Sequence, residues 1–232
     1  MGNLFLEYER PSVTADVVLL RTIDAEHNNR KNNGKELQVR LYKRKEEPFN
    51  AKWSLPGGFV GVDKTIEETA RKKVEEKVGY NNFYLEQLYT FDNIDRDSRW
   101  RVISTAYIGI ANNQSNYISN TEFEAEWFTI NKNTLYSESL DLTLKFEDLA
   151  FDHDEIIKLA IERIKNKIFY TDIAFNFIEE NFTLRELQNV FEVILDHNID
   201  NFRRTMKDKV IPTQKSIQGK AHRPAELYQK KE

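Results

Sequence analysis

The stretch Trp53–Tyr80, WSLPGGFVGVDKTIEETARKKVEEKVGY, decides how this chain folds. Pro56 is followed by Gly57 and Gly58, which allow the backbone to turn sharply and to approach a ligand closely. Apolar residues then recur at every fourth position, which is typical of one face of a helix. These apolar residues are Ile66, Ala70, Val74 and Val78. Gly79 is expected to end the helix, so the stretch predicts a tight loop that leads into an amphipathic helix.

The same stretch resembles the Nudix box. In that motif a glycine is followed after five residues by Glu, and after seven more by Arg-Glu-apolar-x-Glu-Glu-x-Gly. When the two are aligned on Gly58 and Gly79, the spacing is kept without a gap. The segments Trp53–Gly58 and Glu126–Phe128 also resemble the family. The resemblance implies an α/β/α sandwich of the Nudix type.

Lysine occupies most of the positions that carry carboxylates in the Nudix box. Lys64 stands where the family has its first Glu, and Lys72 and Lys73 stand where it has Arg-Glu. Glu76 and Lys77 replace its Glu-Glu pair. In that family the carboxylates hold Mg²⁺, which polarises a pyrophosphate. Ammonium groups offer no lone pair to a metal ion and repel it, so we expect no metal site and no catalytic site, and metal-dependent hydrolysis that is absent or very weak.

Two interpretations of these lysines remain open. In the first, the catalytic requirement lapsed and solvated residues took over a solvated helix face. In the second, Lys73 and Lys77 supply the positive charge that a metal once supplied, and bind an anionic ligand without cleaving it. The second interpretation predicts an effector pocket to which arginines on neighbouring strands contribute. The candidate effector-binding residues are Lys73, Glu76, Lys77, Arg40, Arg99 and Arg101.

Composition excludes several classes of protein. The 232 residues include no cysteine, which excludes a disulfide scaffold, thiolate catalysis and cysteine-ligated zinc. The four histidines are scattered without the spacing of zinc ligands, and we expect no cofactor. No secretory signal and no apolar run long enough to span a bilayer is evident, so we expect a cytoplasmic protein with no membrane partner.

Five segments rich in aromatic and β-branched residues are expected to form strands. They are Thr14–Arg21, Leu37–Lys43, Phe83–Phe91, Arg101–Ala111 and Glu124–Ile130. A further helix is expected from a cap at Asp154 to about Lys167. One helix among several strands indicates an α+β fold. We place a domain boundary just after the second helix, which gives an effector-binding domain at residues 1–168 and a second domain at residues 169–232.

The second domain has the element order of a winged helix-turn-helix. A helix is expected over Asp172–Glu180, and the sequence Thr183–Glu186 matches a capping box that opens the next helix. Asp200 is expected to start a third, short helix that carries Phe202 inward. The segments Val210–Thr213 and Glu226–Gln229 are expected to pair as a hairpin. In a winged helix-turn-helix the third helix enters the major groove and the hairpin contacts the DNA backbone.

Charge is distributed unevenly along the chain. From residue 197 to residue 231 there are nine basic and three acidic residues, which gives +6 by subtraction, so the rest carries about −10 of the net charge of −4. A basic end on an acidic body favours nucleic-acid binding, although basic tails also serve solubility. The candidate DNA-binding residues are Arg185, Arg203, Arg204, Lys207, Lys215, Lys220, His222 and Arg223.

The C-terminal text FTLRELQNVFEVIL, NIDNFRRTMKD and HRPAELY, with RPSVTADVV near the start, resembles the Nudix-related transcriptional regulators. The resemblance implies a homodimer on a palindromic double-stranded operator and a small-molecule effector, which is ADP-ribose in the branch that controls NAD metabolism and a sugar in other branches. We therefore expect a DNA-binding regulator, in the first instance a repressor. The alternatives are a Nudix hydrolase of ADP-ribose that uses other carboxylates, and a nucleotide-binding scaffold that does not bind DNA. The effector and the target genes stay open at this point.

Overall fold

A mixed β-sheet forms the body of the first domain in the computed structural model, which describes residues 9–25, 34–112, 114–118, 122–217 and 225–231. Its strand order is β11-β10-β9-β2-β1-β7-β6, in which β1 and β7 are parallel and the other neighbours antiparallel. The strands are β1 (Ser12–Asp24), β2 (Lys35–Lys43), β6 (Tyr84–Phe91), β7 (Val102–Ile110), β9 (Ala125–Asn131), β10 (Thr134–Ser137) and β11 (Leu142–Lys145). The five predicted strands are confirmed within a few residues at each end.

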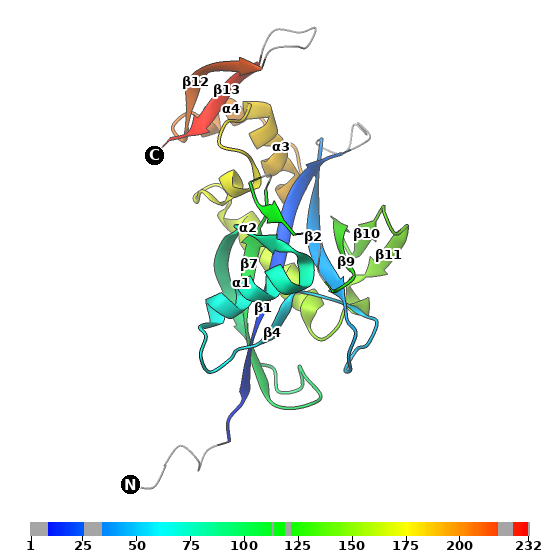
Figure 1. Cartoon of the computed structure of the whole chain (residues 1–232). Helices are drawn as coiled ribbons and strands as arrows, with labels where there is room; N and C mark the ends of the chain where they lie inside the picture. Colours follow the sequence, from blue (N-terminus) through cyan, green and yellow to red (C-terminus); the bar gives the residue numbers. More distant parts are fainter. Residues whose placement is uncertain (1–8, 26–33, 113, 119–121, 218–224, 232) are drawn as a thin grey trace, which may run out of the picture.

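Helices cover both faces of this sheet, as expected for an α/β/α sandwich (Figure 1). Because successive side chains of a strand point to opposite faces, β1 serves two cores. Val17 and Leu19 pack under α1 (Ile66–Val78), whereas Val18 and Leu20 pack against α2 (His153–Lys167). The short strands β3 (Trp53–Ser54) and β4 (Gly57–Phe59) pair with β2 and β1, and β5 (Tyr80–Asn81) pairs with β8 (Asn116–Tyr117). The fold class is confirmed as α+β.

The predicted glycine loop and helix of the Nudix box are confirmed. A capping box at Thr65 and Glu68 opens α1, with the Glu68 backbone N–H donating to the Thr65 hydroxyl at 3.1 Å. Gly79 ends the helix in a left-handed conformation with a φ of 76°. Gly57 cannot be replaced without a shift, because an added Cβ would lie 1.9 Å from the Asp16 carboxylate. The loop is therefore pressed directly onto β1.

The helix α2 begins earlier than the sequence indicates. Asp152, not Asp154, occupies its N-cap position, and Asp154 lies in the first turn, where its carboxylate accepts a hydrogen bond from Lys158 at 2.7 Å. The expected cap at Asp154 is therefore wrong by two residues. The side chain of Asp152 does not bond to the helix backbone, because it is bound by an arginine of another loop.

The second domain has the predicted winged-helix order. Its elements are η3 (Ile173–Phe177), α3 (Leu184–Leu195), α4 (Phe202–Met206), β12 (Val210–Ile217) and β13 (Ala225–Lys230). The helix expected over Asp172–Glu180 is reduced to the single 3₁₀ turn η3. The capping box at Thr183 is confirmed, since its hydroxyl accepts from the Glu186 N–H. The hairpin is longer than predicted and contains an irregularity between Pro212 and Ser216.

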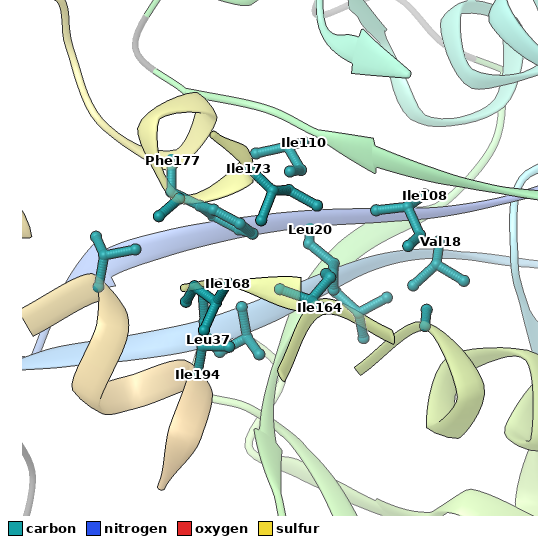
Figure 2. Packing of buried hydrophobic residues seen from close by; sticks show 14 of the residues in the cluster. Val18, Leu20, Leu37, Ile108, Ile110, Ile164, Ile168, Ile173, Phe177 and Ile194 are labelled. Atoms are coloured by element: carbon teal, nitrogen blue, oxygen red, sulfur yellow. The ribbon is translucent and has the colours of Figure 1, made fainter. Parts of the chain in front are cut away.

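One hydrophobic core runs from the sheet into the winged helix (Figure 2). Ile164 of α2 and Ile168 just after it share this cluster with Leu20 and Leu37 of the sheet and with Ile194 of α3. The winged-helix domain sits at the end of the sheet where β1 and β2 come together, away from the first residues of β1 (Figure 1). The two domains therefore share buried side chains and are not joined by a free linker.

We predict that Ile164→Ala destabilises the whole chain. The side chain is 1% exposed, and removing it leaves a cavity that typically costs about 2–5 kcal/mol of unfolding free energy. Urea unfolding monitored by the fluorescence of the sheet tryptophans and by helical circular dichroism should show the loss with both signals. Val62→Ala, at a fully exposed position, is the control and should change stability little. A loss seen by only one signal would contradict a shared core.

Candidate functional site

A polar cavity of about 170 Å³ lies beneath the glycine loop. Its walls come from the start of β1, the end of β2, the loop before β7 and the start of α2. The lining residues are Thr14, Asp16, Tyr42, Arg44, Glu46, Ser54, Leu55, Gly57, Gly58, Phe59, Lys77, Arg96, Asp97, Arg99, Val102, Phe151 and His153. Nucleotide-sized ligands occupy sites of roughly 300–1,000 Å³, so this cavity has room for one part of such a ligand. We call it the loop cavity.

Three cationic side chains at the mouth of the loop cavity are held in place by neighbouring groups. Lys77 donates to the Tyr42 hydroxyl at 2.7 Å and lies 4.2 Å from the centre of that ring. Arg44 donates from Nε to the Pro48 carbonyl at 2.9 Å. Arg99 makes two side-chain bonds to Asp97, at 3.0 and 2.7 Å. Burial alone would raise the pKa of Asp97, but the bonds from Arg99 hold that pKa below its usual value.

The floor of the loop cavity is a buried network of charged groups. Arg96 binds the Asp152 carboxylate with two bonds of 2.9 and 2.7 Å and lies 3.5 Å from Asp16. Asp16 also accepts a hydrogen bond from Ser104 at 2.5 Å. Two parallel bonds between a guanidinium and a carboxylate fix both groups in one geometry. The loop before β7 is thereby fastened to the first residue of α2.

His153, in the first turn of α2, completes this floor. Its Nδ1 accepts the Leu55 backbone N–H at 3.0 Å and lies 3.2 Å from the Ser54 hydroxyl. Its Nε2 lies 3.8 Å from Asp16. Complete burial lowers the pKa of His153, so the ring is neutral and Nδ1 is free to accept. The glycine loop and α2 are therefore joined by a single histidine.

The predicted effector residues do not all meet at this cavity. Lys77 and Arg99 line it, whereas Lys73, Glu76, Arg40 and Arg101 do not. Lys73 lies with its stem against Gly58 and is paired with Glu76 at 2.7 Å, and Lys72 reaches the same carboxylate at 3.2 Å. Arg101 donates to the backbone carbonyl of Asp92 at 2.6 Å.

Arg40 lies further along β2, among aromatic rings. Its guanidinium carbon is 5.6 Å from the ring centres of Tyr117 and Trp127. Its Nη1 lies 3.8 Å from Oε1 of Glu126. The side chain is 7% exposed, and its Nε has no hydrogen-bond partner in the described part of the chain. Phe59 and Trp100 are 50% and 59% exposed. Phe59 borders the loop cavity, beside Arg99.

The structure also adds residues to the site that the sequence did not single out. Arg44, Tyr42 and Phe151 line the loop cavity, and Arg96 and Asp152 tie its floor together. Tyr42 follows Arg40 by two residues, so strand periodicity already places it on the same face. Arg96 and Asp152 are 56 residues apart in the chain, and no local pattern in the sequence connects them.

The basic residues of the winged helix lie on one outer surface as far as they are described. Arg203, Arg204 and Lys207 are exposed on and just after α4, while Phe202 is buried beneath them. Arg185 is exposed in the first turn of α3. The backbone of Lys215 belongs to β12. The predicted contacts Lys220, His222 and Arg223 lie outside the described residues. Phe191 and Leu187 are buried, as expected.

No group of three or more His, Asp or Glu side chains in the described part of the chain is arranged to hold a metal ion. No helix in it is long and apolar enough to cross a membrane.

Fold and site together define a Nudix-type ligand-binding domain joined to a winged-helix DNA-binding domain. The NUDIX domain family matches residues 29–148, and the NrtR DNA-binding winged helix domain family matches residues 174–229. The chain is 33% identical over 231 residues to an ADPR-responsive transcriptional repressor, NtrR, of Acinetobacter baylyi, covering 96% of this chain and 83% of that protein. The chain belongs to this family of Nudix-related transcriptional regulators.

Two further relatives represent the two functions found with this fold. The crystal structure of Shewanella oneidensis NrtR complexed with a 27mer DNA is 30% identical, with a TM-score of 0.70, covering 94% of this chain and 93% of that one. An ADP-ribose pyrophosphatase of Methanocaldococcus jannaschii is 32% identical over 124 residues, covering 53% of this chain and 66% of that protein. The similarity to the DNA-bound protein spans both domains, whereas the similarity to the enzyme spans about half of the chain.

We predict that His153 makes the folded protein less stable in mild acid. Its pKa is lowered by burial, so the unfolded chain takes up a proton below about pH 6.5 while the folded protein does not. The stabilisation is complete above that pH and is lost as the pH falls toward the lowered folded-state pKa. In His153→Asn, whose amide oxygen can still accept the Leu55 N–H, the fall in the urea midpoint between about pH 7.5 and pH 5.5 should be smaller.

His197→Asn is the matched control, because His197 is exposed. It should keep the pH dependence of the wild type. Equal pH dependence in all three proteins would show that His153 is not the group responsible.

Proposed function

We propose that the protein is a transcriptional repressor that binds operator DNA through its winged helix and senses ADP-ribose through its Nudix domain. The observation that supports this most strongly is the whole-length similarity to an ADPR-responsive repressor, together with α4, which carries exposed basic residues over a buried Phe202. The DNA complex of the Shewanella relative supports the same role for the winged helix.

The loop cavity is the proposed site for the diphosphate of the effector. Lys77, Arg44 and Arg99 surround its mouth, and each is already oriented by a neighbouring group. Preorganised cations bind a phosphate with less loss of side-chain freedom. The nucleoside would then extend past Tyr42 along the face of the sheet that carries Arg40, which keeps Arg40 a candidate for its far end. Lys73 and Glu76 are satisfied by each other and would take part only if that pair opened.

Loss of hydrolysis is part of the proposal. Among the Nudix-box positions that would bind metal, Glu76 is the remaining carboxylate, and it is held between Lys72 and Lys73. Bonds from these two lysines outweigh the effect of burial and keep the pKa of Glu76 below its usual value. Two other carboxylates of α1 are engaged too, since Glu67 pairs with Arg71 and Glu68 caps the helix.

The similarity to an ADP-ribose pyrophosphatase keeps hydrolysis as the second candidate function. It would require the carboxylates of α1 to leave their present partners and gather around a metal ion. Lysine ammonium groups on the same helix face would oppose such a gathering by Coulomb repulsion.

Helix α2 offers the physical connection between the effector site and DNA. Its N-cap residue Asp152 binds Arg96 beneath the loop cavity, and its first residue His153 lines that cavity. Its last turns pack against α3 through Ile164 and Ile168, and Lys167 forms an ion pair with Glu86 of β6. A ligand that moves the floor must also shift the helix that supports the winged domain. Such coupling requires that ADP-ribose bind the DNA-competent and DNA-incompetent states with different affinity.

Four finer points belong to the same proposal. The boundary between the domains falls after residue 168, where α2 has ended. The protein acts as a homodimer on a palindromic operator, since two copies of α4 are needed to reach two half-sites about one helical turn apart. It works in the cytoplasm, where its DNA target lies. It uses no cofactor.

The response to effector is the direct test of the proposed function. ADP-ribose should change the affinity for an operator fragment about fivefold or more, the usual lower range of allosteric coupling. Lys77→Glu should abolish the response at the same ADP-ribose concentration, because it places a carboxylate at the mouth of the loop cavity. Lys72→Glu, at a more exposed position of the same helix and outside the cavity, is the matched control and should keep most of the response. Equal behaviour of the two variants would argue against the loop cavity.

Phosphate release tests the absence of hydrolysis. Incubation with ADP-ribose, Mg²⁺ and a phosphatase should give no inorganic phosphate above the rate without protein, because the metal-binding positions of the Nudix box offer one engaged carboxylate instead of a metal cage. Glu76→Gln distinguishes a genuine activity from a contaminant. Turnover by the wild-type protein that this variant abolishes would establish an enzyme and overturn the assignment.

A further inference from the structure

An arginine of α4 and two residues of the strand β13 are connected by hydrogen bonds. Arg203 donates from Nη2 to the Tyr228 hydroxyl at 3.3 Å, and this hydroxyl donates to the Glu226 carboxylate at 2.5 Å. A phenol has one proton and also accepts hydrogen bonds. Because the phenolic O–H is directed at the carboxylate, the phenol oxygen presents its lone pairs to the guanidinium. The two hydrogen bonds therefore form a chain with one direction, from Arg203 to Tyr228 and from Tyr228 to Glu226.

Tyr228 holds this chain in place because its own position is fixed by the fold. The residue is 8% exposed and belongs to the shared core. Its backbone N–H and carbonyl both pair with Phe182, at 2.7 and 3.0 Å. The hydrogen bond to Glu226 raises the pKa of Tyr228, and burial adds to the shift, so the hydroxyl keeps its proton at neutral pH. The guanidinium of Arg203 is therefore anchored to the interior of the domain.

The neighbouring basic residues differ from Arg203. All three side chains are exposed, but those of Arg204 and Lys207 make no hydrogen bond or ion pair with the described residues. All three residues line one groove between α4 and the two strands of the hairpin. Glu226 lines the same groove, although a carboxylate there repels the phosphates of any DNA sequence. Because Glu226 lowers the affinity for DNA of any sequence, its presence in this groove suggests a role in sequence selectivity.

We propose that Tyr228 and Glu226 are positioning residues that hold the Arg203 guanidinium in the orientation needed to read a base edge. Arginine recognises guanine by two parallel bonds, which demand a fixed plane of the guanidinium. Arg204 and Lys207, which are free to move, contact phosphates and contribute affinity without sequence preference. The inference rests on the proposed function, because it requires α4 to lie in the DNA groove.

Tyr228→Phe tests the proposal with the smallest change available, since it removes the hydroxyl and leaves the buried ring. Affinity should be measured at several salt concentrations for the operator and for an unrelated duplex of equal length. Binding to the operator should weaken about tenfold, the order expected when one base contact is lost, while binding to the unrelated duplex changes less than about twofold. The dependence on salt should not change, because no charge is removed.

Arg204→Ala is the matched control on the same helix. It should weaken binding to both duplexes alike and reduce the salt slope by about 0.9, the value for one phosphate contact. The proposal is overturned if Tyr228→Phe leaves the ratio of the two affinities unchanged, or weakens both duplexes equally.

Arg203→Lys provides a second route that does not touch the core. It keeps the charge and loses the planar fork, so it should lower discrimination as Tyr228→Phe does. Combining the two substitutions should add no further loss, and additive losses would contradict the chain of bonds. If the wild-type protein binds the operator no better than the unrelated duplex, it is the proposed function that fails, and not the role of Tyr228.

Discussion

The packing of α2 between the sheet and the winged helix is the constraint on which the rest of the structure depends. Its apolar residues face Val18 and Leu20 of β1 on one side and approach α3 on the other (Figure 2). Four apolar side chains of α2 are almost completely removed from water, which stabilises its packing. They are Ile156, Ile157, Ala160 and Ile164. A short linker between the domains would not provide that burial. The winged domain is consequently held at one end of the sheet, and its basic surface has a defined position relative to the loop cavity.

At its N-terminal end, α2 is held by ion pairs and hydrogen bonds instead of apolar contacts. Arg96, Asp16 and His153 are buried and Asp152 is half-buried, and each has a partner within the network. Buried charges destabilise a fold unless each is paired and fully hydrogen-bonded. Displacing one member of the network therefore weakens the bonds of the others. The glycine loop touches the same groups, because Gly57 has no room for a side chain against Asp16. Ligand binding at the loop and the position of α2 are physically linked through these residues.

Much of the fold could be predicted from the sequence, because local patterns encode it. The period of the apolar residues placed α1 correctly, and the capping box at Thr183 placed α3 correctly. Strands of two to four residues, such as β3 and β10, were missed, because so few residues show no periodicity. The cap of α2 was misplaced because Asp152 is recruited by Arg96, a long-range interaction that outweighs local preference. The candidate site was only partly predictable for the same reason. Lys77 and Arg99 line the cavity. Lys73, which is on the same helix as Lys77, forms an ion pair with Glu76 instead.

Hydrogen exchange with and without ADP-ribose tests the central claim most directly, since it reports on each helix separately. If α2 transmits the state of the loop cavity, ADP-ribose should change the exchange of backbone amides in α3 as well as in the glycine loop and the first turn of α2. A change confined to the glycine loop and that first turn, with α3 exchanging as before, would contradict the account.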